Sequence, residues 1–270
     1  MRVAAFQFDV RVADPEANLA AVERGLLEAR ERDVELVLLP EMWTISFLPD
    51  ERLDAGLERA NEAALEQAKR WSAELGLVIA GSALGPRRGP RSLPTNRLTV
   101  HERGEAVLEY DKVHLFTPTA EGEAFAPGEA APATIACAGA QLSGVVCYDL
   151  RFPEILRVPF RAGAELLLAC AQWPDKREGH WRSLVIARAI ENQCFVLGTN
   201  RTGVAVIGRR KLELRFPGRS LIVSPLGEVL AEAGSEPGLT VADIDFAEAR
   251  RYRRQIPAQK DERRDLYAQW

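Results

Sequence analysis

The sequence is poor in the residues that build metal sites. Its four cysteines show no CxxC spacing, and its three histidines lie far apart along the chain. Protein zinc sites use closely spaced cysteine and histidine pairs, so we expect no zinc and no other metal.

Long apolar runs are also absent. No stretch of about 18 apolar residues, the length needed to span a membrane, occurs in the chain. The opening "MRVAAFQFDV" is too short for a signal peptide and contains Asp9. We therefore expect no membrane association, and free thiols in a reducing, cytoplasmic setting.

An excess of positive charge is missing as well. The net charge is −4, and residues 1–249 hold 28 basic against 36 acidic residues. An acidic body repels nucleic acid, so we expect no nucleic-acid partner. Residues 250–270 carry seven basic and three acidic residues and end in aromatic Tyr267 and Trp270. We expect this tail to pack on its own body or on a second subunit.

What remains is typical of a soluble globular protein. The 270 residues are 47% apolar and contain no repeat or clear linker, which favours a single domain over 1–270. Apolar runs and helix-period segments alternate, which predicts an α/β fold. The expected strands are 2–10, 34–40, 75–82, a hairpin over 97–112, 144–149, 165–170, 195–200 and a pair over 219–233; the expected helices begin at 15 and 153 or cover 53–75 and 179–193. We expect 85–94 to be a surface loop.

Three reactive side chains follow strands. Glu41 comes directly after "LVLLP", Lys112 after "LEYD", and Cys147 after "GVV". Functional groups in α/β sheets gather beyond the carboxyl ends of strands, so these three side chains could converge on one crevice. Taken singly, each has a plain alternative: a solvated acid, a surface charge and a core residue.

A chemical argument connects these side chains. A thiol with a pKa of about 8.5 needs a base before it can attack a carbonyl, and no histidine lies beside the three strand ends. A buried carboxylate can be that base because burial raises its pKa. A lysine could then stabilise the oxyanion, by roughly 3 to 4 kcal/mol for one good donor.

Five segments, in this order, resemble the nitrilase superfamily of carbon–nitrogen hydrolases. They are "LLPEMW", "YDKVHLF", "VVCYDLRFPEILR", "HWRSLVIARAIENQCFVLGTNRTG" and "FPGRSLIVSPLGEVL". The resemblance extends from about residue 3 to the closing "RRDLY". It implies a four-layer αββα sandwich with two mixed β-sheets, no cofactor, and a homodimer.

The same resemblance implies roles for individual residues. Glu41 would be general base and acid, Lys112 would hold the oxyanion, and Cys147 would be the nucleophile. A second glutamate is expected in the loop after the lysine, and Glu121 matches it better than Glu123. The backbone N–H of Tyr148 would be the other oxyanion donor.

The residues around the cysteine also resemble one branch of the family. Nitrilases proper follow their cysteine with Trp-Glu, whereas Tyr148 and Asp149 follow it here, as in the amidase branches. "AQWP", "HW" and "NRTG" are similar to bacterial omega-amidases that act on amides of 2-oxo acids. In that interpretation Trp173 lies in the substrate pocket, although it could instead cover the core. Arg151 and Arg201 are candidates for binding a substrate carboxylate, or structural ion-pair partners.

The sequence therefore predicts an enzyme that hydrolyses a small-molecule amide to acid and ammonia through a cysteine thioester. An N-carbamoyl-amine or deaminated-peptide amide hydrolase is the alternative within the family. A non-catalytic binding protein on the same fold is the alternative outside enzymology. The shape of the pocket depends on loops at 43–50, 117–130 and 173–180.

Overall fold

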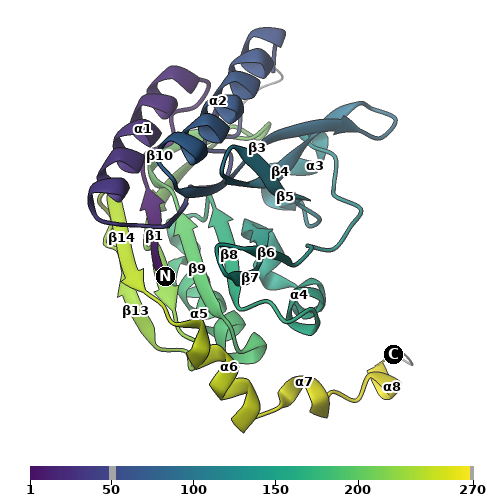
Figure 1. Cartoon of the computed structure of the whole chain (residues 1–270). Helices are drawn as coiled ribbons and strands as arrows, with labels where there is room; N and C mark the ends of the chain where they lie inside the picture. The colour runs from purple at the N-terminus through teal and green to yellow at the C-terminus, as the bar shows by residue number, and fades with distance from the viewer. Residues whose placement is uncertain (49–52, 268–270) are drawn as a thin grey trace.

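The computed structural model describes residues 1–48 and 53–267. They form four layers, with two β-sheets face to face and helices on both outer sides (Figure 1). This is the αββα sandwich that the resemblance implied.

The first sheet has six strands in the order β14-β1-β2-β3-β4-β5. Their bounds are β1 Arg2–Gln7, β2 Leu36–Leu38, β3 Val78–Arg88, β4 Leu93–Glu102, β5 Glu105–Asp111 and β14 Gly238–Asp243. β1, β2 and β3 are parallel, and the other pairs are antiparallel. Since β4 runs opposite to both of its neighbours, β5 points the same way as β2 and ends at the same edge.

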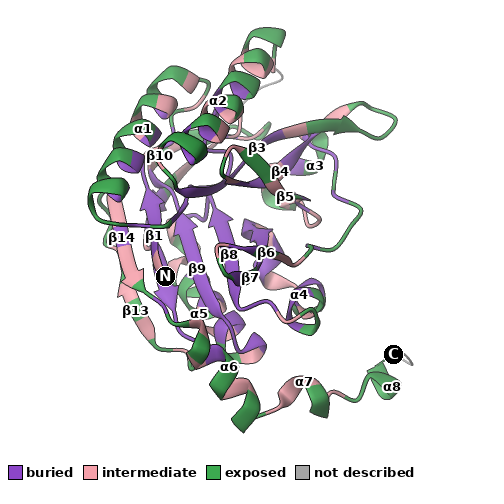
Figure 2. Ribbon diagram, in the orientation of Figure 1, coloured by how far each residue is buried: buried purple, intermediate pink, exposed green. Residues whose placement is uncertain are grey.

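The second sheet has the order β13-β12-β9-β8-β7-β6. Its strands are β6 Ile135–Cys137, β7 Ala140–Val146, β8 Leu166–Ala171, β9 Phe195–Asn200, β12 Leu221–Val223 and β13 Val229–Glu232. β7, β8 and β9 are parallel and buried (Figure 2), as continuous apolar runs predict. Both sheets are mixed.

Two helix pairs cover the sheets, and their bounds are α1 Pro15–Glu31, α2 Ala55–Glu74, α4 Pro153–Arg161 and α5 Glu178–Asn192. Asp14 and Asp54 cap α1 and α2 by accepting hydrogen bonds from first-turn backbone N–H groups. Val3 and Ala5 of β1 face the second sheet, whereas Ala4 and Phe6 pack under α1 and α2. This alternation produces two apolar layers, one between the sheets and one under the first helix pair.

Two local expectations were wrong. Residues 85–94 are a loop only at the turn 89–92, since 85–88 and 93–94 are the ends of β3 and β4, and Pro86 is tolerated there because it lies where the register shifts between Leu84 and Arg87. The strand predicted over 144–149 ends at Val146, and a short 3-10 turn, η2 Cys147–Arg151, follows. The sequence also gave no warning of a hairpin formed by β10 Thr202–Ile207 and β11 Leu212–Pro217.

The chain ends in α6 Phe246–Gln255, α7 Ala258–Asp261 and α8 Arg264–Tyr267. Phe246 packs edge-on against Phe195 of the second sheet at 6.0 Å between ring centroids. Arg253 donates to backbone carbonyls at the carboxyl ends of α4 and α5. α7 is attached to the end of α4, because Gln259 donates to the backbone carbonyls of Phe160 and Arg161 and the next residue after α7, Glu262, pairs with Arg161 at 2.9 Å. Trp270 lies outside the described residues, and among the described helices none has the length and apolarity to cross a bilayer.

Candidate active site

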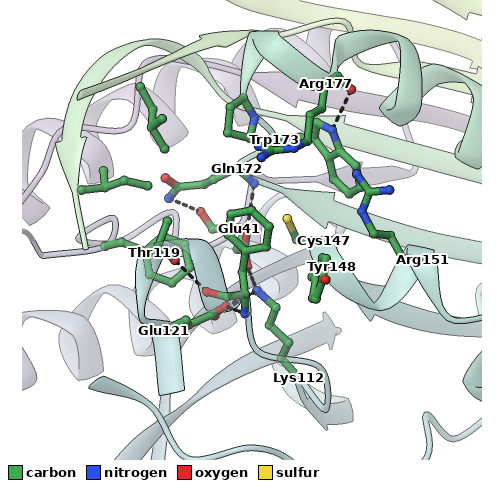
Figure 3. A pocket seen from close by; sticks show the side chains of 15 residues that line it. Glu41, Lys112, Thr119, Glu121, Cys147, Tyr148, Arg151, Gln172, Trp173 and Arg177 are labelled. Atoms are coloured by element: carbon green, nitrogen blue, oxygen red, sulfur yellow. Dashed lines mark hydrogen bonds and ion pairs between the residues drawn. The ribbon is translucent and has the colours of Figure 1, made fainter. Parts of the chain in front are cut away.

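Three strand ends bring Glu41, Lys112 and Cys147 to one pocket, and Glu121 joins them from the short helix α3 Glu121–Ala124 (Figure 3). β2 and β5 carry the first two residues from one sheet, and β7 carries the third from the other. The cavity measures about 460 Å³, its open mouth included. The other lining residues are Phe47, Phe116, Thr119, Tyr148, Arg151, Gln172, Trp173, Pro174, Arg177, Ile207 and Leu214. Residues 49 and 50 of the first expected pocket loop lie outside the described residues.

Left-handed backbone occurs at or beside the reactive residues. Cys147 has φ +48°, Met42 after Glu41 has φ +49°, and Ala120 before Glu121 has φ +57°. Each costs about 1 to 2 kcal/mol for a residue with a β-carbon. Such a backbone turns the chain sharply at or next to the reactive residue. Strained backbone at a reactive residue such as Cys147 is typical of functional sites.

Lys112 is buried between two carboxylates. Its Nζ donates to Glu41 Oε1 at 2.8 Å and to both Glu121 oxygens at 2.9 Å, and all three side chains are at most 2% exposed. Burial alone would lower the pKa of Lys112, but Glu121 and Glu41 outweigh it and raise that pKa well above its ordinary value. An ammonium has three protons, so one for each carboxylate leaves a third for a substrate oxygen.

Glu41 is held at both carboxylate oxygens. Asn96 Nδ2 donates to Oε1 at 2.9 Å, and the Gln172 backbone N–H donates to Oε2 at 2.8 Å. Gln172 Nε2 also donates to the Glu41 backbone carbonyl at 2.8 Å. The carboxylate therefore has a single orientation before any substrate arrives.

The Cys147 thiol is protonated at rest. Burial, reinforced by the Glu41 carboxylate, raises its pKa well above the ordinary value, and the Lys112 ammonium opposes that rise. Burial likewise raises the pKa of Glu121, whose Oε2 accepts a hydrogen bond from the Phe116 N–H at 2.6 Å. A buried neutral thiol in contact with a carboxylate can lose its proton directly to that carboxylate.

Asp149 connects the cysteine turn to the lysine strand. It is fully buried and accepts from Tyr110 Oη at 2.8 Å and from the backbone N–H groups of His114 and Val146 at 2.9 and 3.2 Å. Tyr110 and His114 flank Lys112 by two residues on either side, and Val146 precedes Cys147. One carboxylate thus fixes the distance between two strand ends that lie in different sheets.

Trp173 and Arg151 both line the pocket, and Trp173 also packs in the core, so both roles considered for it have a contact to match. The Arg151 guanidinium is 4.9 Å from the centre of the Trp173 ring, and Trp173 Nε1 donates to the Arg177 carbonyl at 2.9 Å. Arg177, which the sequence did not single out, also lines the pocket, 5.6 Å from the Phe116 ring centre. No carboxylate of the described residues pairs with Arg151 or Arg177.

Arg201 does not reach the cavity, which corrects its candidacy as a substrate-binding residue. It is 0% exposed, pairs with Asp9 at 2.8 Å, and donates to Ser46 Oγ and Gln172 Oε1 at 3.0 and 3.2 Å. The alternative role, a structural ion pair, is the one the contacts fit. Glu123, the weaker candidate for the second glutamate, lies at the surface 3.7 Å from Arg209.

Gln172, Asn96 and Arg177 escaped the sequence analysis. Gln172 follows β8 directly, so the strand-end rule that found Glu41 could have found it. Asn96 lies inside β4 and carries no pattern that marks it. Within residues 1–48 and 53–267, no group of three or more His, Cys, Asp or Glu side chains could hold a metal ion.

Comparison with known proteins gives consistent results. The model of the carbon–nitrogen hydrolase family matches residues 2–254. The chain is 35% identical over 265 residues to the 2-oxoglutaramate amidase of Bacillus subtilis, covering 98% of each chain. It is 34% identical over 254 residues to the omega-amidase YafV of Escherichia coli K12, covering 92% of this chain and 91% of that one.

Solved structures match the same architecture. An amidase from Nesterenkonia sp. AN1 superposes with a TM-score of 0.85 at 31% identity, covering 100% of this chain and 96% of that one. In that structure, of a mutant, the acetamide moiety of fluoroacetamide is covalently attached to the active-site cysteine.

Proposed function

The chain belongs to the carbon–nitrogen hydrolase family, and from that premise we propose that it is an amidase that releases ammonia from an omega-amide of a 2-oxo dicarboxylic acid. The observation that carries the proposal is the buried contact of Glu41, Lys112, Glu121 and Cys147 at the base of one pocket. No cofactor takes part in the proposed chemistry.

In the proposed first half-reaction, Glu41 accepts the Cys147 proton while the sulfur attacks the amide carbonyl carbon. The carbonyl electron pair moves onto oxygen, where Lys112 Nζ and the Tyr148 backbone N–H donate to it. Tyr148 is in the first turn of η2, where backbone N–H groups have no partner within the helix. The carbon–nitrogen bond then breaks, Glu41 returns the proton to the leaving nitrogen, and ammonia departs from a thioester.

In the second half-reaction, Glu41 takes a proton from water, whose oxygen attacks the thioester carbon. The carbon–sulfur bond breaks, the acid leaves, and the sulfur is protonated again. Glu121 keeps Lys112 charged and aimed at the oxyanion throughout. Because the resting thiol and the attacking water are both neutral, each nucleophilic attack is coupled to the transfer of a proton to Glu41.

The substrate class rests on the charges of the outer pocket. At its base the Lys112 ammonium is paired with the Glu41 and Glu121 carboxylates, whereas Arg151 and Arg177 have no acidic partner in the described part of the chain. Their guanidinium groups lie against Trp173 and Phe116, which excludes water from one side of each. An amide whose far end carries a carboxylate would place that end at these two cations.

A first experiment tests the chemistry. Cys147→Ala should abolish ammonia release from 2-oxoglutaramate, and undiminished turnover by that variant would refute the proposal. A panel of 2-oxo-acid amides, aliphatic amides and carbamoyl compounds identifies the substrate class. Carbon dioxide released along with ammonia would instead indicate an N-carbamoyl substrate, and binding without any thioester adduct would indicate a non-catalytic protein.

A second experiment tests the carboxylate subsite. Arg151→Gln and Arg177→Gln should each raise KM for 2-oxoglutaramate about 10- to 100-fold, the value of one charged hydrogen bond. Neither should change KM for a neutral aliphatic amide by more than about twofold. Equal loss on charged and neutral amides would contradict a carboxylate subsite.

We also propose a cytoplasmic homodimer built from one domain, residues 1–270, with the tail at 250–270 packed on the partner subunit. Ile256 and Tyr267 are exposed apolar side chains on this tail, 50% and 44% accessible. The four free cysteines support a reducing compartment. A monomeric mass in light scattering at micromolar concentration, or a dimer that survives removal of 257–270, would contradict the assembly.

A further inference from the structure

Arg201 is a buried cation that contacts Gln172, which in turn contacts the proposed base Glu41. It follows β9 and is 0% exposed, with its guanidinium 4.5 Å from the Phe216 ring centre. Nη2 pairs with Asp9, and Nη1 donates to Ser46 Oγ and Gln172 Oε1. Burial lowers the pKa of Arg201 to about 10, against the pull of Asp9, so the guanidinium is charged at neutral pH.

These donors fix the side-chain amide of Gln172. Its Oε1 accepts from both Arg201 and Ser46, at 3.2 Å each. The amide nitrogen must therefore point the other way, where it donates to the backbone carbonyl of Glu41. Without Arg201, the side-chain amide of Gln172 would lose a charged hydrogen-bond donor and could flip, so that its oxygen and nitrogen exchange places.

Gln172 in turn holds one particular oxygen of Glu41. Oε1 accepts from Lys112 and Asn96, whereas Oε2 accepts only the Gln172 backbone N–H among the described residues. Oε2 thus keeps a lone pair for the thiol proton. The position of Gln172 decides where that lone pair points.

We infer that Arg201 is a positioning residue of the reaction, which holds the proton-accepting oxygen of Glu41 through Gln172. The inference rests on the proposed function of Glu41. The charged and titratable groups that face Glu41 are Lys112, Glu121 and Cys147, together with the buried thiol of Cys170 on β8. Arg201 and Asp9 face it through Gln172, as an ion pair with opposite effects.

The opposite charges of Arg201 and Asp9 give a test that a purely structural role does not pass. Arg201→Gln should lower kcat for 2-oxoglutaramate about 10- to 100-fold with KM changed less than threefold, because a displaced base costs rate rather than binding. It should also move the acidic limb of the plot of kcat/KM against pH to higher pH, by about 0.5 unit, since a positive charge that faces the site through Gln172 is lost.

Asp9→Asn removes the opposing negative charge and should move the same limb to lower pH. Arg201→Lys keeps the charge and should restore the limb to its wild-type position, with kcat between those of wild type and Arg201→Gln. Arg253→Gln is the matched control: it removes a half-buried arginine that binds only backbone carbonyls, and should change thermal stability without moving the limb.

The inference is overturned if the acidic limb of the kcat/KM profile has the wild-type position in both Arg201→Gln and Asp9→Asn. It is also overturned if the limb moves in the same direction in both variants. A rise in KM confined to anionic amides would also overturn it, because Arg201 would then bind substrate. If Arg201→Gln does not fold, Asp9→Asn alone decides the direction. Failure of the proposed function is distinguishable, since wild type and Cys147→Ala would then release ammonia equally.

Discussion

Replacing Lys112 by methionine should produce an enzyme whose stability depends on pH in a way that wild type does not. The substitution removes the ammonium between Glu41 and Glu121, and both carboxyl groups remain at most 2% exposed. Removing one partner of a buried ion pair costs about 3 to 5 kcal/mol. Part of that cost disappears if one carboxyl group takes up a proton.

The direction follows from linkage. Burial already raises the pKa of Glu121 in the wild type, and loss of Lys112 removes the group that opposes that rise. A carboxyl group whose pKa is raised in the folded state contributes its full stabilisation of the fold below its unfolded-state pKa of about 4.3. This contribution is lost as the pH rises through the pKa of the folded state. The variant should therefore lose about 1.4 kcal/mol of stability per pH unit above about pH 5, relative to wild type.

Urea unfolding followed by tryptophan fluorescence at about pH 5.5 and pH 8 measures this difference. Adding Glu121→Gln to the Lys112 variant should recover stability at pH 8 but not at pH 5.5, because it removes the unpaired charge. Lys69→Met, at a partly exposed lysine 3.9 Å from Glu105, is the control and should show no such dependence. A loss of stability that is equal at both pH values would refute the reasoning.

Three further predictions concern the fold. Gly128→Ala would place a β-carbon 2.1 Å from the backbone carbonyl oxygen of Asp111, the residue before Lys112, and should cost about 1 to 3 kcal/mol of folding stability and some activity. Gly179→Ala, with open space around it, should cost neither, and chemical denaturation compares the two variants. Burial raises the pKa of all four thiols, to about 12 for Cys137 and Cys194. The free energy of unfolding should therefore be constant up to about pH 8.5 and fall above it, by up to about 1.4 kcal/mol per pH unit for each thiol, and a melting temperature that is flat from pH 8 to 10 would contradict this. Burial lowers the pKa of His101 to about 4, so up to about 3 kcal/mol of stability should be lost as the pH falls from 6.5 to 4. In an acid titration of folding stability, His101→Phe should make this loss smaller.

The sequence predicted most of the architecture because its signals are local. Continuous apolar runs identified the parallel strands, and the aspartates before α1 and α2 marked real helix starts. The end of the hairpin within 85–94 was missed because prolines argue against a strand, and only the pairing of β3 with β4 shows that Pro86 lies at a register shift, where a proline is tolerated. The β10–β11 hairpin is half exposed, and only β11 has the alternation of apolar and polar residues that marks a strand, whereas β10 has none.

The site was predictable where a residue follows a strand, and not where its role depends on a distant partner. Glu41, Lys112 and Cys147 were found by that rule. Arg201 follows a strand too, but whether its side chain turns to the cavity or to Asp9 depends on a residue 192 positions away. Asn96 and Arg177 owe their positions to tertiary contacts alone.

The pairing of β1 with β14 sets the order in which the chain can finish folding. Residues 2–7 emerge from the ribosome before the other strands of this sheet, yet their edge neighbour is 238–243. At 5 to 20 residues per second, that neighbour is synthesised roughly 12 to 50 seconds later. The sheet that carries Glu41 and Lys112 thus remains open on one side for most of translation, and a nascent chain interrupted before residue 238 should be an incomplete hydrolase that is vulnerable to proteolysis.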